Sequence, residues 1–356
     1  MGRAPARGRA ACARRMPLLR VWQVSCAALP ALATAISSGS SSATQSQSPP
    51  AWNQDAFFIS FWVGPQVEAD ELDFRFAEIA EANFTGYLGF NGNSKSPFRP
   101  NSTRVEKEIE LCDKHGLRCV PSNCGPVWTV EGPCLAMGKG SKNFWGFQLL
   151  DEVGAFAKMG AWQEQLQAAR PGALNFFNLL GDTPFPSPDA YSAYVNSFVT
   201  QVHPQVISMD FYPQFPQTLS VDPPDFPASG LGEAGVRSGS RRLPQSKDEY
   251  GESLAVLRQQ AELAPGGPIP WWCFFNAMPY DRAHTDPTEA MMKWQAMTAL
   301  TYGASGVMYF CYWSPLGVFE LGGGLVVPRG TPVRRRNHST SATDLLPVAL
   351  CLVRFL

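Results

Sequence analysis

The segment FWGFQLLDEVGAFAKMGAWQEQLQAA (residues 144–169) contains both patterns that decide the fold. Residues 144–150 are almost all apolar, as expected for a parallel strand that is covered on both faces. From Ala155 to Ala169, apolar residues recur at steps of three and four, which predicts a helix with one apolar face. The segment therefore predicts one strand–helix unit with two carboxylates, residues 151–152, at its junction.

The same alternation of an apolar run and a helix-period segment repeats along the chain. The apolar runs are residues 57–63, 84–90, 117–122, 144–150, 173–180, 206–212, 269–275 and 306–313. Repeated strand–helix units favour a parallel sheet with right-handed crossovers, and eight of them favour a closed (β/α)₈ TIM barrel of the α/β class. An open doubly wound sheet is the alternative, but no glycine-rich nucleotide motif follows the first run.

The chain divides into four expected regions. They are a signal or targeting peptide (1–35), a Ser-rich disordered spacer (36–54), the (β/α)₈ domain (55–320) and an irregular basic tail (321–356). The pattern fades after Trp313, so the last helix is expected to be degenerate or truncated. Two further irregular stretches, residues 123–143 and 213–246, fall where loops build the active face of such barrels.

Composition excludes several classes of protein. The 356 residues are 45% hydrophobic and 12% aromatic, which is too apolar for a disordered chain. A net charge of −1 argues against a nucleic-acid partner bound through bulk positive charge. No run of residues is long and apolar enough to predict a stable membrane span. The oligomeric state does not follow from the sequence.

The amino-terminal region predicts a destination. Six arginines and no acid precede the apolar run 21–36, and Ala33-Thr34-Ala35 offers a small-residue cleavage site. This order is typical of a secretory signal peptide and predicts secretion or an endomembrane lumen, with an organellar transit peptide as the alternative. Sequons at Asn83, Asn101 and Asn337 would permit glycosylation there. Among the cysteines, Cys124 could pair with Cys134, and Cys112 with Cys119.

Polar and aromatic residues stand where the predicted strands end, which is where barrels carry their chemistry. The expected substrate-binding residues are Trp62, Asn123, Asp151, Asn178, Tyr212, Asn276 and Trp313. Aromatic faces stack on sugar rings, and amides and carboxylates bond to hydroxyl groups, so the set indicates a carbohydrate substrate. For each aromatic ring, packing in the core is the competing interpretation.

Glu152 and Asp210 are the candidate catalytic residues. Glycoside hydrolysis needs one carboxylic acid to protonate the leaving oxygen and usually a second carboxylate. Glu152 follows an apolar strand beside another acid, although Asp151 could be a helix cap and Glu152 a first-turn acid. Asp210 interrupts an apolar run, although it could be the structural partner of a loop. The four histidines are scattered and no C-x-x-C occurs, so neither a metal nor a cofactor is expected.

The sequence resembles the TIM-barrel glycoside hydrolases, in particular the β-galactosidase-like clan. The resemblance rests on FWGFQLLDEVGAFAKM, on ALNFFNLLGD with VISMDFYP, and on WQAMTALTYGASGVMYFCYWSP, and it spans about residues 55–320. It implies a barrel that hydrolyses O-glycosidic bonds of an oligo- or polysaccharide, with Glu152 as the proton donor at the end of strand four.

One departure from that clan leaves the mechanism open. The clan has a nucleophilic Glu at the end of strand seven, where this chain has Asn276. Three alternatives follow: Asp210 is the partner carboxylate, the substrate assists its own hydrolysis, or the protein binds carbohydrate without catalysis. The strand-six sequence MDFY, with a late Trp on strand eight, is similar to chitinase-type barrels that use a substrate acetamido group.

Overall fold

The structure is a computed structural model that describes residues 52–89, 101–126, 128–130, 133–182, 184–213, 247–278 and 287–313. Its strands are β1 (Phe58–Phe61), β2 (Gly86–Leu88), β3 (Arg118–Val120), β4 (Gly146–Leu150), β5 (Leu174–Phe177), β6 (Ile207–Asp210), β7 (Trp271–Asn276) and β8 (Gly306–Phe310). Its helices are α1 (Leu72–Glu81), α2 (Ser102–His115), the 3₁₀ helix η1 (Pro133–Ala136), α3 (Phe156–Ala169), α4 (Pro188–Val202), α5 (Lys247–Glu262) and α6 (Glu289–Thr301). Each predicted apolar run contains one of these strands.

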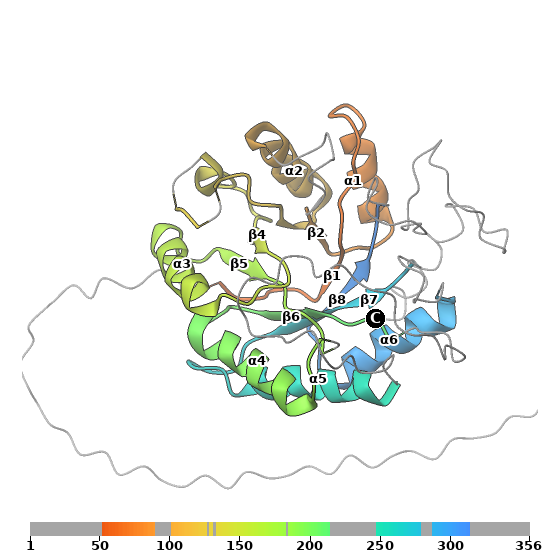
Figure 1. Cartoon of the computed structure of the whole chain (residues 1–356). Coiled ribbons are helices and arrows are strands. Elements are labelled where there is room, and N and C mark those ends of the chain that lie inside the picture. Colours follow the sequence, from red (N-terminus) through yellow and green to blue (C-terminus); the bar gives the residue numbers. More distant parts are fainter. Residues whose placement is uncertain are drawn as a thin grey trace, which may run out of the picture. The chain divides into compact units, whose positions relative to one another are not determined.

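All strand pairs are parallel, as the apolar runs predicted. They form a sheet in the order β1-β8-β7-β6 and two smaller sheets, β2-β3 and β4-β5. The first strand pairs with the last, with Phe58 in register with Gly306. Figure 1 shows the strands at the centre and the helices around them.

Single hydrogen bonds and bridges connect the edges of these sheets. The amide of Thr85 donates to the carbonyl of Ile59 at 3.0 Å, which links β2 to β1. Ser122, just after β3, forms a bridge with Gln148 of β4, and Leu179, just after β5, forms one with Met209 of β6. Each strand is therefore connected to its neighbours in chain order, and β8 is connected to β1. The closed barrel itself stays a prediction.

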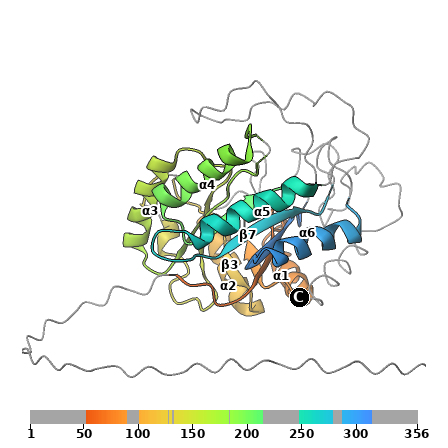
Figure 2. The same ribbon diagram turned by 90° about the horizontal axis from the view of Figure 1, so that it is seen from below.

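The helices follow one another around the outside of the strands. α3 lies next to α4 and α4 next to α5, as both views show (Figures 1 and 2). α5 and α6 are joined where the Tyr250 hydroxyl donates to the Gln295 carbonyl at 3.1 Å. In the irregular stretch between β3 and β4, the described residues form only η1. The long stretch from 214 to 246 and the residues after Trp313 lie outside the described residues.

An aromatic cluster fills the interior near the amino-terminal ends of the strands. The Trp272 ring stacks on Phe58 at 4.4 Å and on Phe176 at 5.4 Å between centroids. Trp145 contacts Phe58 at a tilt, with 5.3 Å between centroids, and stacks on Trp272 at 6.2 Å. Gly86 makes room for this cluster, because a Cβ atom there would overlap the Phe58 ring.

The residues just before β1 also pack on this end of the strands. The Trp52 ring contacts Trp145 edge-on at 5.4 Å. The Gln54 side chain donates to the Ser305 carbonyl at 2.6 Å and accepts from the Trp272 indole at 3.0 Å. The described fold thus begins at Trp52, inside the predicted spacer 36–54. The other spacer residues and the regions 1–35 and 321–356 lie outside the described residues.

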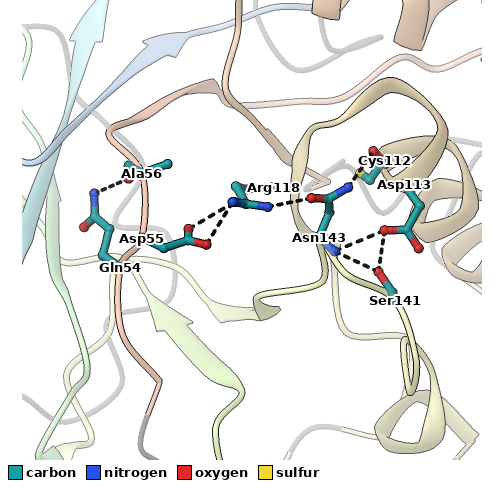
Figure 3. Close-up of polar contacts among 8 residues, drawn as sticks. All are labelled: Gln54, Asp55, Ala56, Cys112, Asp113, Arg118, Ser141 and Asn143. Carbon is teal, nitrogen blue, oxygen red and sulfur yellow. Dashed lines mark hydrogen bonds and ion pairs between the residues drawn. The ribbon is translucent and has the colours of Figure 1, made fainter.

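Polar contacts hold the chain before β4 against the same end of the strands (Figure 3). Arg118 of β3 bonds to the Asp55 carboxylate at 2.8 and 3.0 Å and donates to the Asn143 side chain. Asp113 accepts from the Ser141 hydroxyl at 2.8 Å and from the Asn143 amide at 3.1 Å. This network fixes the start of β4 and hence the position of the residues that follow its end.

Four cysteines are buried and free: Cys112, Cys119, Cys273 and Cys311. The Cys112–Cys119 pairing is therefore absent, although the two thiols lie within hydrogen-bonding range. Cys124 is disulfide-bonded, to a sulfur outside the side chains that the structure describes. None of the described helices is long and apolar enough to cross a membrane.

Replacing Gly86 by Ala is expected to destabilise the domain by about 1–3 kcal/mol, because the added methyl group overpacks the aromatic cluster. The free energy of unfolding in urea measures this effect. Adding Phe58→Leu removes the ring that the methyl group meets, so the loss in the double variant should be smaller than the sum of the two single losses. Additive losses would show that the contact with Phe58 is not the cause.

Candidate functional site

The carboxyl ends of β4, β5 and β6 bring three predicted site residues together. The Asn178 side-chain amide donates to the Asp151 carboxylate at 3.0 Å. The same nitrogen lies 3.4 Å from the Asp210 carboxylate, a weaker contact. These residues are distant in sequence and meet because parallel strands end at the same edge.

The amide oxygen of Asn178 is also bonded. It accepts from the Ser208 hydroxyl of β6 at 2.9 Å, and both residues are buried. The amide nitrogen therefore faces the carboxylates and the amide oxygen faces the hydroxyl. Ser208 was not among the expected site residues, because a serine within an apolar run carries no sequence signal of a bond to another strand.

Glu152 joins the cluster from the turn after β4. Its carboxyl group is within hydrogen-bonding range of the Asp210 carboxyl group. The residue is exposed, whereas Asp210 and Asp151 are partly buried. Its φ angle of 49° is in the left-handed region that non-glycine residues rarely adopt. Strain of this kind is often found where the surrounding structure must hold a side chain in one place.

Burial and mutual repulsion favour the protonated forms of the three carboxyl groups. Burial, followed by the charge of Glu152, raises the pKa of Asp151 from its usual 3.8 to about 7. Burial and both neighbouring acids raise the pKa of Asp210 well above its usual value. Although the residue as a whole is exposed, the surrounding protein partly desolvates the Glu152 carboxyl group, which raises its pKa, while the interaction with Asp210 lowers it. Of the three groups, Asp210 therefore holds a proton most strongly.

Tyr194 of α4 connects the two loops that carry the cluster. Its hydroxyl donates to the Val153 carbonyl at 2.7 Å and accepts from the Leu180 amide at 3.2 Å. Val153 directly follows Glu152, and Leu180 lies two residues after Asn178. In the sequence Tyr194 was one of several apolar-stripe residues of a helix, and nothing there distinguished its hydroxyl group.

The remaining predicted site residues have other contacts. Trp62 is 7% exposed and lies edge-on to Phe274 at 5.2 Å. Trp313 is 2% exposed and lies under the Arg75 guanidinium at 5.3 Å. Tyr212 is half-buried and packs on a strand-eight ring. None of these contacts reaches the carboxyl cluster, so a role as a sugar platform stays a prediction for each of the three.

The two amides outside the cluster are engaged in local turns. Asn123 accepts from the Gly125 amide at 3.1 Å. Asn276, at the end of β7, is fully buried and accepts from the Met278 amide at 3.1 Å. Within the described residues 271–278 no carboxylate stands at the end of β7. Among the described strand ends, the acidic side chains are therefore those of Asp151, Glu152 and Asp210.

The opposite end of the strands has a hollow of about 770 Å³ with mainly apolar walls, among them Phe57, Ile59 and Leu300. Its two basic residues are already paired, His115 with Asp73 at 2.7 Å and Arg118 with an acid before β1. Because both residues are paired, neither offers a free positive charge to an ionic ligand in this hollow. Across the described part of the chain, no three metal-binding side chains come together.

Solved structures show which fold this arrangement is similar to. A proposed alpha-L-fucosidase from Bacteroides thetaiotaomicron matches 76% of this chain and 91% of its own, at 11% identity and a TM-score of 0.50. A β-galactosidase from the psychrophilic Marinomonas ef1 matches 83% of this chain at 12% identity and a TM-score of 0.54, and the match spans 59% of that enzyme's length. No protein-family model and no curated protein matches the sequence.

These matches support the expected fold at a coarse level. The matched enzymes are TIM-barrel proteins, so the strand–helix order described above is that of a TIM-barrel fold. At identities of 11% and 12% the similarity concerns the fold alone. Activity and residue roles have to be argued from the site.

The stability of the domain is expected to fall as pH rises from about 4 to about 7, because in this window the folded Asp151 still binds a proton that the unfolded chain has released. Urea unfolding at a series of pH values measures this dependence. Asp151→Asn should make it shallower, since the substituted residue does not titrate. The matched control is Asp189→Asn at an exposed position of α4, and an equal effect of both variants would contradict the assignment.

Tyr194→Phe is expected to lower the free energy of unfolding by about 1–3 kcal/mol, because the Leu180 amide loses its acceptor. Tyr191→Phe is the matched control on the same helix, since its hydroxyl contacts only the weakly accepting Met209 sulfur at 3.0 Å. Urea unfolding of both variants compares them. An equal or larger loss in the control would show that Tyr194 does not hold the two loops.

Proposed function

We propose that the chain is a glycoside hydrolase on a closed (β/α)₈ barrel, with Glu152 as general acid/base and Asp210 as the second carboxylate. The observation that carries the proposal is the cluster of carboxyl groups beyond the ends of β4 and β6. In it the Asn178 amide nitrogen lies 3.0 Å from Asp151 and 3.4 Å from Asp210, and Glu152 directly follows Asp151. The substrate is an oligo- or polysaccharide with O-glycosidic bonds. The predicted signal or targeting peptide (1–35) and the sequons fit a secreted glycoprotein.

Closure of the barrel is supported by the hydrogen bonds between neighbouring strands. β1 and β8 pair over four residues, and the bridges from Ser122 and Leu179 continue the order between the sheets. Closure brings the ends of all eight strands around one axis. The carboxyl cluster on β4, β5 and β6 then lies at the rim where such enzymes bind their substrates.

The separation of the two carboxyl groups distinguishes the possible mechanisms. Retaining enzymes separate their carboxyl groups by about 5–5.5 Å and inverting enzymes by about 6.5–9.5 Å, so that a sugar carbon or a water fits between them. The exposed Glu152 is assigned to the contact with the glycosidic oxygen, and the partly buried Asp210 is the second carboxylate.

The reaction then follows in balanced steps. Glu152 donates its proton to the glycosidic oxygen, and the bond from that oxygen to the anomeric carbon breaks with its electron pair on the leaving oxygen. A water oxygen bonds to the anomeric carbon, and the Glu152 carboxylate takes the water proton. In a 2-acetamido sugar, the acetamido oxygen would hold the anomeric carbon between the two steps.

A non-catalytic carbohydrate-binding barrel is the second candidate. It is favoured by the end of β7, where the buried Asn276 binds a backbone amide instead of presenting an acid to a sugar. Such a protein would use the same polar rim to hold hydroxyl groups. Wild-type hydrolysis of any glycan would exclude it.

Glu152→Gln is expected to lower kcat by at least about 10²-fold without changing the fold, because the amide cannot donate the catalytic proton. Hydrolysis of a panel of aryl glycosides and oligosaccharides, with and without 2-acetamido groups, measures this loss. Glu164→Gln, at an exposed position of α3, is the charge-matched control and should keep full activity.

The panel also separates the alternatives. Activity restricted to 2-acetamido sugars would identify the substrate-assisted route, and glycan binding without turnover would identify the binding protein. Unchanged turnover in the Glu152 variant would refute the proposed role of this residue.

A further inference from the structure

The contacts of Asn178 go beyond those of a substrate-binding amide. Its nitrogen faces the Asp151 and Asp210 carboxyl groups, and its oxygen accepts from Ser208. The side chain is 2% exposed. Little of its hydrogen-bonding capacity remains for a sugar hydroxyl group, and a sugar would have little access to it.

We propose that Asn178 is a positioning residue: its amide nitrogen faces both Asp151 and Asp210 and holds the facing oxygen of each aspartate as a hydrogen-bond acceptor. As a catalytic role this rests on the proposed function, but the proton arrangement can be measured without it. An amide nitrogen only donates, so the Asp210 oxygen facing Asn178 is held as an acceptor. The proton of Asp210 is then placed on its other oxygen.

Ser208 has a defined part in this arrangement. A carboxamide can rotate by half a turn and exchange its nitrogen and oxygen. The Ser208 hydroxyl, 2.9 Å from the Asn178 oxygen, stabilises the orientation in which the nitrogen faces the carboxylates. Without the hydroxyl the buried oxygen would lack this donor, and the rotated form would become more favourable whenever an aspartate is protonated.

Among the described residues, no cation is found to act on the carboxyl cluster. The influences on the carboxyl groups of Asp151 and Glu152 are burial, each other's charge, and hydrogen bonds, with no lysine, arginine or histidine among them. From α4, Tyr191 and Tyr194 face the cluster, and burial raises the pKa of both. Both tyrosines are therefore neutral wherever the carboxyl groups titrate, and Asn178 is the donor that distinguishes the two aspartates.

The test is a ¹³C NMR titration of the side-chain carboxyl groups in the full chain labelled with ¹³C-aspartate and ¹³C-glutamate. Asn178→Ser should raise the titration midpoint of Asp151 by about one pH unit, because the ionised form loses a hydrogen bond. Ser208→Ala should move the midpoint in the same direction by less, and it keeps the proposal testable if the Asn178 variant does not fold.

Two controls match these variants in chemistry and burial. Asn175→Ser changes a buried amide on the same strand, whose nitrogen has no partner. Ser253→Ala removes a buried hydroxyl group of α5 that also has no partner. Neither should shift the midpoints of Asp151 and Asp210. Shifts in the site variants that are no larger than in these controls would overturn the proposal.

The outcome is separable from that of the proposed function. If the wild-type chain hydrolyses a glycan, the alkaline limb of its kcat–pH profile, which reports the carboxyl group that must be protonated, should move upward in Asn178→Ser, with KM little changed. Shifted carboxyl midpoints without hydrolysis by the wild type would support the proton arrangement and refute the enzyme. Hydrolysis with unshifted midpoints would support the enzyme and refute the role of Asn178.

Discussion

Contact between aromatic rings at the amino-terminal ends of the strands is the interaction on which the rest of the domain depends. Phe58, Trp145, Phe176 and Trp272 come from four strand segments and pack against one another in the interior. Burial of each large apolar side chain stabilises the fold by about 1.5–3 kcal/mol. This offsets the cost of holding several acids together, partly buried, at the other ends of the same strands. The aromatic cluster and the carboxyl cluster thus lie at opposite ends of the strands.

At the carboxyl ends of the strands, neutral side chains contact the acids and no ion pair with them is described. Asn178 contacts both Asp151 and Asp210, and burial with mutual repulsion favours the protonated form of Asp210. The pair of loops above is held by the Tyr194 hydroxyl. A lysine or arginine in this position would have ionised the acids and removed the proton that general acid catalysis requires. The backbone strain at Glu152 fits a side chain whose position is set by its neighbours.

The sequence predicted the elements well because each strand is apolar at nearly every position, which local composition reveals. It also indicated Glu152 and Asp210, since an acid at the end of an apolar run is unusual. It did not indicate Ser208 or Tyr194, whose roles depend on partners 14 to 41 residues away in the chain. Nor did it separate the buried packing of Trp62 from a sugar platform, because both need the same large ring.

The free thiols in the interior make the chain its own reporter of local opening. Cys112 lies on α2 and Cys119 on β3, whereas Cys273 lies on β7 and Cys311 directly follows β8. Burial raises the pKa of all four thiols, so the reactive thiolate is scarce in the closed state. The rate at which an alkylating reagent modifies each thiol then measures how often the structure around that cysteine opens. The native cysteines thus report local opening separately in two parts of the fold, without an engineered label.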